Sequence, residues 1–306
     1  MGKFIIKRLL LTIPVILGVS IAAFMMSHMV PGDPVSVMLG ETATAEDVER
    51  LREELGFNDP IAVQYLRYVS NAVQGDLGTS IRSGQPVMNE ILERFPSTLQ
   101  LTLVAIVLAS SIGIPLGVFA AVRGAGWTDT SIMAFAMLGI SMPTFWSGIL
   151  LILLFSLKLG WFPVTGSGPM ALVLPSIALA APSGAVLARI TRSSVLEVAQ
   201  LDYVQTARAK GLRERWVIYG HILRNAMIPV LTIIGLQFGG LLSGSVIVES
   251  VFTRAGLGRY AVTAIQSRDF PQIQGIVIFV AFIYVFVNLA IDIFYSFIDP
   301  RIRISQ

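Results

Sequence analysis

Long apolar runs separated by polar stretches dominate the sequence. A helix needs about 20 mostly apolar residues to cross the hydrocarbon core of a membrane. Six segments have this character, at about 9–30, 98–122, 131–157, 171–188, 226–250 and 273–298. The fourth is the weakest, because it is short and contains two prolines. The pattern predicts an all-α polytopic membrane protein with six transmembrane helices.

The first apolar run predicts a retained helix, although Lys3, Lys7 and Arg8 precede it as basic residues precede a secretory signal. The apolar core of a signal is about 7–15 residues long and ends at a small-residue cleavage site. This run is long enough to span a membrane and ends at Pro31-Gly32-Asp33-Pro34 instead.

Composition supports the membrane assignment. Hydrophobic residues make up 54% of the 306 residues and charged residues only 13%, whereas globular domains are about 25% charged. One soluble core of this size cannot hide so much apolar surface, so the surplus should face lipid. Cysteine is absent, which excludes disulfides and thiolate metal sites.

The basic residues predict the orientation. Lysine and arginine gather on the cytoplasmic side of membrane proteins, so the net charge of +3 does not indicate nucleic-acid binding. If the N-terminus is cytoplasmic, 13 of the 22 basic residues lie in short cytoplasmic segments. These residues are Lys3, Lys7, Arg8, Arg123, Arg189, Arg192, Arg208, Lys210, Arg213, Arg215, Arg224, Arg301 and Arg303. We therefore expect a membrane protein with both termini in the cytoplasm.

The external segment 31–97 has the start and stop signals of soluble helices. Thr44 can cap a helix with an acidic first turn, which Gly56 would end. Asn58-Asp59-Pro60 then opens a second helix that ends at Gly75. This insertion either contacts a delivery protein or forms a lid over the outer ends of the spans.

The cytoplasmic connection 189–225 predicts two helices broken at Gly211, because glycine is common just past a helix end. Arg208 and Lys210 lie in the turn before the break, where positive charge suits the helix dipole. The alternative is a solvated basic loop.

Catalytic and nucleotide-binding motifs are missing. No lysine lies in a GxxxxGK[ST] sequence, so the chain has no P-loop. The two histidines, His28 and His221, lie at opposite faces in the predicted topology. We expect no catalytic residue, no metal site and no cofactor in this chain, and we do not expect an enzyme.

A few polar residues interrupt the spans. They can line a translocation path or join helices by hydrogen bonds, and no proton relay is visible among them. Asp292 is an intramembrane acid, a functional suspect by default, although pairing at the inner interface explains it as well. Glu249 lies where the fifth span would reach the outer interface. The candidate path residues are Gln237, Ser243, Ser245, Asn288 and Asp292.

One stretch of the cytoplasmic connection resembles the signature loop of ABC importer permeases, most closely the dipeptide, oligopeptide, nickel and glutathione branch. It reads DYVQTARAKGL from Asp202 to Leu212 and continues as HILRNAMIP from His221 to Pro229. The similarity runs end to end, and further matching motifs lie at 31–34, 75–78, 256–259, 268–270 and 298–303.

The resemblance implies a location in the bacterial inner (cytoplasmic) membrane. It also implies a type I ABC importer permease fold, in which this loop forms a coupling helix seated in a groove of the ATPase. Gly211 matches the small residue at the break and Ala207 the second alanine of the pattern. Gln205 and Arg224 depart from the broader importer pattern, as they do in the peptide branch. The implied coupling residues are Tyr203, Thr206, Ala207, Arg208, Lys210, Gly211, Leu212 and Arg213.

The resemblance also implies partners: a paralogous second permease in a heterodimer, two ATP-binding subunits, and a periplasmic or lipid-anchored substrate-binding protein. The expected domains are an N-terminal helix at 1–30, the external loop at 31–97, the permease core at 98–298, and a cytoplasmic tail at 299–306. Uptake of di- or oligopeptides is favoured over glutathione and nickel chelates. Different-class alternatives are a membrane scaffold without its own transport path and an autonomous carrier.

Overall fold

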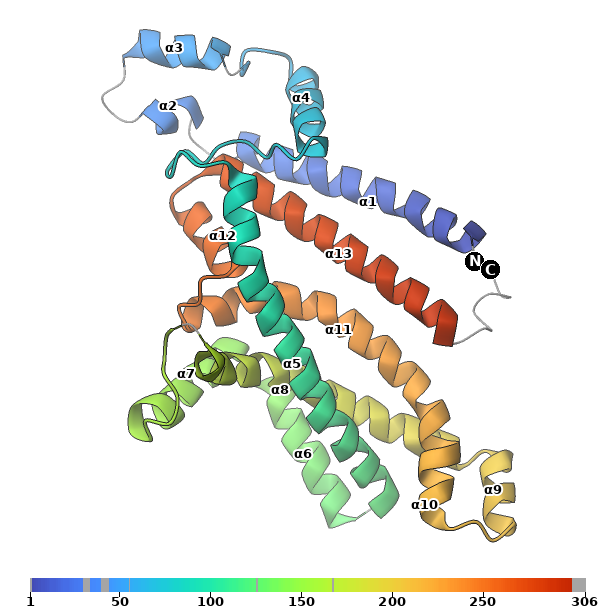
Figure 1. Ribbon diagram of the computed structural model, residues 1–306. Coiled ribbons are helices and arrows are strands. Elements are labelled where there is room, and N and C mark those ends of the chain that lie inside the picture. Colours follow the sequence, from blue (N-terminus) through green and yellow to red (C-terminus); the bar gives the residue numbers. More distant parts are fainter. Residues whose placement is uncertain are drawn as a thin grey trace. The chain divides into compact units, whose positions relative to one another are not determined.

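The computed structural model describes residues 2–29, 34–39, 44–54, 56–124, 126–166 and 168–298 (Figure 1). Across these ranges the chain is helical and contains no strand, only an isolated bridge between Thr79 and Pro86. It forms two compact units. Unit 1 comprises Met1–Pro96 and Ala255–Leu289, and unit 2 comprises Ser97–Arg254 and Ala290–Gln306. The all-α prediction is confirmed.

Five long apolar helices correspond to five of the six predicted spans. They are α1 (Gly2–Met29), α5 (Val87–Arg123), α8 (Pro169–Ala199), α11 (Leu223–Val251) and α13 (Phe270–Ile298). The long helix α5 passes from unit 1 into unit 2.

The third predicted span, 131–157, is not one helix. It consists of α6 (Trp127–Ser141) followed by α7 (Thr144–Leu151) and the π-helical turn η1 (Ile152–Lys158), and the two halves are bent by 103°. Pro143 explains the break, because the residue before a proline avoids the helical region. Met142 accordingly has φ −83° and ψ 125°. The described residues therefore hold five spans, or six if the bent pair counts as one.

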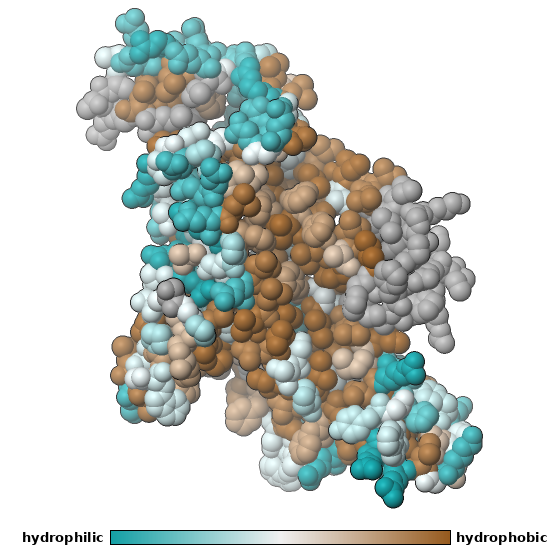
Figure 2. Space-filling view, in the orientation of Figure 1, coloured by the Kyte–Doolittle hydropathy of each residue, from teal (hydrophilic) through white to brown (hydrophobic). Residues whose placement is uncertain are grey.

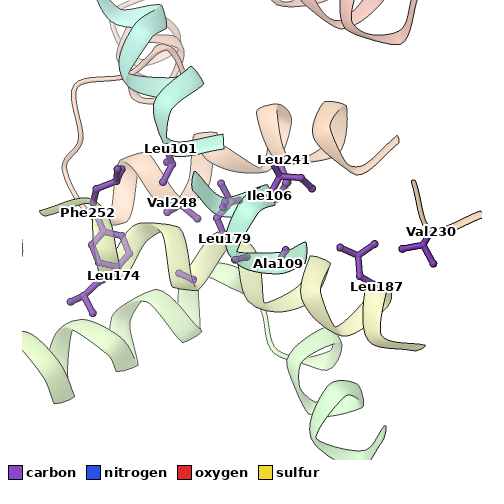
Figure 3. Close-up of a cluster of buried hydrophobic side chains, with 14 residues drawn as sticks. Leu101, Ile106, Ala109, Leu174, Leu179, Leu187, Val230, Leu241, Val248 and Phe252 are labelled. Atoms are coloured by element: carbon purple, nitrogen blue, oxygen red, sulfur yellow. The ribbon is translucent and has the colours of Figure 1, made fainter. Parts of the chain in front are cut away.

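Helix α8, the weakest span in the sequence, is the most buried of the five long helices. It packs against α6, α7 and α11. The hydrophobic cluster at its centre joins side chains of α5, α8 and the α11 segment (Figure 3). A helix surrounded by protein needs less lipid-facing hydrophobicity, which explains its weak signal. Neighbouring helices can also satisfy the backbone groups freed by its prolines, Pro175 and Pro182.

Small residues let α5 and α8 approach closely. A Cβ atom at Gly113 would collide with the carbonyl oxygen of Gly184, and one at Gly117 with that of Ala188. Packing at such spacings is a main source of helix association in lipid. This GxxxG pair therefore serves packing within the chain.

The segment predicted to be external lies in unit 1 and contains α2 (Pro34–Leu39), α3 (Ala45–Glu54) and α4 (Ile61–Val73). The Thr44 hydroxyl accepts the backbone N–H of Asp47 at 3.2 Å, as the predicted cap requires. Gly56 and Gly75 have φ of +70° and +84°. Helix α12 (Leu257–Gln266) packs with residues 77–95 in a second apolar cluster of this unit.

The predicted break at Gly211 is present, with φ of +78°. Helix α9 (Asp202–Ala209) precedes it, and α10 (Glu214–Trp216) follows and runs through the π-helical turn η2 (Val217–Ile222) into α11. A second break, at Gln200–Leu201, separates α8 from α9 and was not predicted from the sequence.

Candidate functional site

One face of α9 is anchored in unit 2. Val204 is 0% and Ala207 6% exposed, and both belong to an apolar cluster with side chains of α5, α8, η2 and α11. These two residues are three positions apart and so share a face of the helix. The packing leaves the opposite face of α9 and the turn after it uncovered.

The uncovered face carries most of the residues that the sequence assigns to coupling. Hydrophilic side chains gather over α9 and its turn in Figure 2. Ala207 differs from the others, since it is buried and anchors the helix without forming part of the surface. The exposed members are Tyr203, Thr206, Arg208, Lys210, Gly211, Leu212 and Arg213.

An ion pair braces the turn. The guanidinium of Arg208 donates to both carboxylate oxygens of Glu214, at 2.7 and 3.2 Å. These bonds raise the pKa of Arg208. Gln205 donates to the backbone oxygen of Ala199 at 3.1 Å and ties α9 to the end of α8. The ion pair thus braces the turn after α9, and the Gln205 bond braces the break before it.

Gly211 lies at the tip of this turn. Its φ of +78° belongs to the left-handed region that favours glycine, and no atom lies within 4 Å of the position a Cβ would occupy. A side chain at this position would therefore point into open space, where a partner surface could approach.

A second set of polar contacts joins α9 to α11. Asn225 donates through Nδ2 to the Tyr203 hydroxyl oxygen at 2.8 Å and to the His221 backbone oxygen at 3.2 Å. The Tyr203 hydroxyl donates to the same His221 oxygen at 3.3 Å. Sequence reasoning did not select Asn225, Glu214 or Val204 for this site. Only the spacing of Val204 and Ala207 could have indicated the anchored face.

The described candidate path residues have different surroundings. Gln237 donates to the backbone oxygen of Ser183 at 3.1 Å and so joins α11 to α8. Ser245 is 1% exposed and donates to Leu242 in its own helix. Ser243 is exposed. Asn288 belongs to unit 1 and is half-buried, and the side chain of Asp292 lies outside the described part of the chain.

Glu249 does not reach the interface, contrary to the sequence-based expectation. Its side chain is 0% exposed, and Oε1 accepts the Thr98 hydroxyl at 2.6 Å. Arg254 donates to Gln100 at 2.9 Å. Tertiary packing turns the carboxylate of Glu249 inward. The Glu249–Thr98 and Arg254–Gln100 hydrogen bonds link the end of the α11 segment to α5.

The family described as "binding-protein-dependent transport system inner membrane component" matches residues 113–304. The chain belongs to this family. The N-terminal region of the same kind of membrane component matches residues 1–102. The protein is thus a multi-span inner-membrane permease of an ABC importer, and the family is not itself enzymatic.

Curated permeases resemble this family member along its length. The glutathione transport system permease protein GsiC of Escherichia coli K12 is 46% identical over 99% of both chains. GsiC of Shigella dysenteriae is equally similar.

Solved transporters share the fold. The MetNI methionine ABC transporter matches with a TM-score of 0.59 and 16% identity, over 69% of this chain and 97% of that one. An amino acid ABC transporter matches with a TM-score of 0.50 and 24% identity, over 70% and 94%. The type I importer permease fold is confirmed.

Proposed function

We propose that this permease takes up glutathione or a closely related short peptide. Support comes from the 46% identity to glutathione permeases over 99% of both chains. The sequence by itself favours di- or oligopeptides, but the full-length similarity gives more weight to glutathione. The two proposed substrates are chemically close, because glutathione is itself a small peptide.

We also propose that α9 and the Gly211 turn receive the motion that ATP hydrolysis produces. The apolar face of α9 is fixed to α5, α8 and α11, while its polar face is uncovered and braced by the ion pair between Arg208 and Glu214. A rigid, exposed helix that is anchored to several spans can pass on a displacement to all of them. The anchored α9 is the observation that carries this proposal.

The proposed partners follow from the family. They are a paralogous permease that completes the path, two ATP-binding subunits, and a periplasmic or lipid-anchored binding protein. With both termini in the cytoplasm, α9 would face the ATP-binding subunits. No cofactor is needed for this role.

The coupling proposal is tested by affinity purification of the tagged permease from gently solubilised membranes. We expect the paralogous permease and the ATP-binding subunits to co-purify with the wild type, and Gly211→Arg to lose the ATP-binding subunits and abolish uptake. The arginine side chain would occupy the open space at the tip.

The matched control is Gly211→Asn, because asparagine tolerates the left-handed conformation and has a small side chain. It should retain the ATP-binding subunits and much of the uptake. Normal uptake by Gly211→Arg would contradict the assignment of this turn.

Substrate choice is tested with proteoliposomes that hold the complete transporter, its binding protein and ATP. We expect uptake of radiolabelled glutathione that unlabelled glutathione suppresses more strongly than a simple dipeptide does. Stronger competition by the dipeptide, or no glutathione uptake, would assign the transporter to other peptides.

A further inference from the structure

Helix α9 has two routes to α11. The covalent route runs through the left-handed turn at Gly211, the short helix α10 and the π-helical turn η2. The second route is the set of hydrogen bonds between Tyr203, His221 and Asn225. It connects the first turn of α9 directly with the first turn of α11 and bypasses the turn and most of η2.

The covalent route is poorly suited to pass on a displacement. Glycine turns allow unusual backbone freedom. A stretch of π-helix departs from regular α-helical geometry and is found mostly as isolated turns at functional sites. The ion pair of Arg208 with Glu214 braces the glycine turn, but η2 lies between this brace and α11 and can change shape when α9 is pushed.

Apolar packing alone does not fix the register of α9 on η2. Val204 and Ala207 pack against Val217, Ile222 and Ala226, but the hydrophobic effect is non-directional. Hydrogen bonds depend steeply on distance and angle. The bonds among Tyr203, His221 and Asn225 therefore fix α9 against η2 and α11. The bond of Gln205 to Ala199 fixes it against α8.

We propose that Asn225 is a positioning residue which, with Tyr203, transmits the movement of α9 to α11. This inference rests on the proposed coupling role of α9 and adds the route by which the movement enters the membrane. Beyond Asn225, α11 carries the Gln237 contact to α8 and ends near the buried Glu249. The route thus leads from the cytoplasmic loop to the helices of unit 2.

The hydrogen bonds among Tyr203, His221 and Asn225 form a tie between α9 and α11, and the exposure of this tie makes it testable. Tyr203 and Asn225 are exposed, whereas the apolar cluster beneath them is buried. Removing the Asn225 side of the tie should therefore leave folding and assembly intact and change only how α11 responds. We choose Tyr203→Phe and Asn225→Leu, which remove the polar groups and preserve much of the side-chain shape. Asn225→Asp should keep α9 tied to α11 with the bond reversed, because its carboxylate can accept the Tyr203 hydroxyl in place of the His221 oxygen.

The natural chain contains no cysteine, so spin labels can be placed at Ser193→Cys on α8 and Ser250→Cys on α11, both exposed positions. The labelled permease is assembled with cysteine-free partner subunits. The distance between the labels is then measured without nucleotide and with the ATP-trapped complex. This readout requires no knowledge of the transported solute.

We expect a nucleotide-dependent change of distance in the wild type. It should persist in Asn225→Asp and in the control Thr232→Val, which removes a hydroxyl bonded within α11. It should vanish in both Tyr203→Phe and Asn225→Leu. In Asn225→Leu, which changes no residue of the uncovered face of α9, the ATP-binding subunits should remain bound and hydrolyse ATP. The double variant should behave like either single variant, as expected for two residues acting as one unit.

A preserved distance change in both single variants would overturn the inference, and so would a wild-type complex in which α11 does not move. Loss of the ATP-binding subunits from Asn225→Leu would also overturn it, because the tie would then serve only to shape the docking surface. Failure of the proposed coupling role has a different signature. In that case Gly211→Arg would retain the ATP-binding subunits.

Discussion

At the scale of the residue, two glycines with different neighbours show why context decides the meaning of a motif. A Cβ at Gly113 would meet the backbone of α8, whereas one at Gly240 would have no atom within 4 Å, although both glycines occur at GxxxG spacing. The sequence pattern is the same at both positions. Only the packing shows which glycine is required for a close approach.

We expect Gly113→Leu to destabilise the folded permease by at least about 1–3 kcal/mol, because the new side chain would collide with the backbone of Gly184. The measurement is the melting temperature in detergent, followed by fluorescence-detected size exclusion. Gly240→Ala is the control and should leave the melting temperature unchanged or slightly higher. An equal effect of the two substitutions would argue against the described contact of α5 with α8.

At the scale of the element, polar contacts join helices that the sequence places far apart. The guanidinium of Arg192 on α8 forms a bidentate ion pair with the carboxylate of Asp129 on α6, with both bonds at 2.5 Å. Arg192 appears in the sequence as one of several cytoplasmic positive charges. In the fold it pins the first turn of α6 to α8, beside the α5–α8 contact.

Breaking this pair should cost about 1–3 kcal/mol, the usual range for leaving a buried polar or charged group without its partner. Asp129→Asn should lower the melting temperature, and Arg192→Lys should do so as well, since lysine lacks the bidentate geometry of arginine. The double variant should lose less than the sum of the two single losses. Strict additivity would show that the pair contributes nothing as a unit.

The buried carboxylate of Glu249 provides a second test at this scale. Glu249→Leu removes the acceptor of the Thr98 hydroxyl and should lower the free energy of unfolding by about 1–3 kcal/mol. Glu249→Gln keeps an acceptor oxygen and should be much milder. The melting temperatures of both variants, compared with Thr98→Val, report this difference. Equal losses in the leucine and glutamine variants would indicate that the negative charge matters instead of the hydrogen bond.

At the scale of the whole molecule, the family and the predicted orientation describe how the chain is placed in the membrane. The basic residues of the loop around α9 and of the N-terminus indicate the cytoplasmic side. The external segment holds α2, α3 and α4 in unit 1. The predicted orientation would place α9, the proposed coupling helix, in the cytoplasm and the segment with α2, α3 and α4 outside the membrane.

Single cysteines test the orientation cleanly in a cysteine-free chain. A membrane-impermeant maleimide should label Ser83→Cys in cells whose outer membrane has been permeabilised. It should label Gln200→Cys only after the inner membrane is also opened. Both positions are exposed in the structure, so a reversed labelling pattern would invert the predicted topology.

Much of the molecule could be predicted from the sequence because the relevant signals are local. Apolar runs place the spans, Thr44 and Gly56 delimit an external helix, and Gly211 breaks the cytoplasmic one. The motifs around Gly211 also indicate the family. Each of these signals depends on neighbouring residues and on the rules of helix ends or membrane insertion.

Only the tertiary structure decided which side of each helix is buried and which distant residues meet. A helix that faces lipid is apolar on all sides, so its sequence lacks the one-sided pattern that marks the buried face of a soluble helix. Thr98 and Glu249 meet although 151 residues separate them, and Pro143 turns a predicted span into two helices at 103°. Asn225 likewise becomes part of the candidate site only when folding brings α9 against the N-terminal end of α11.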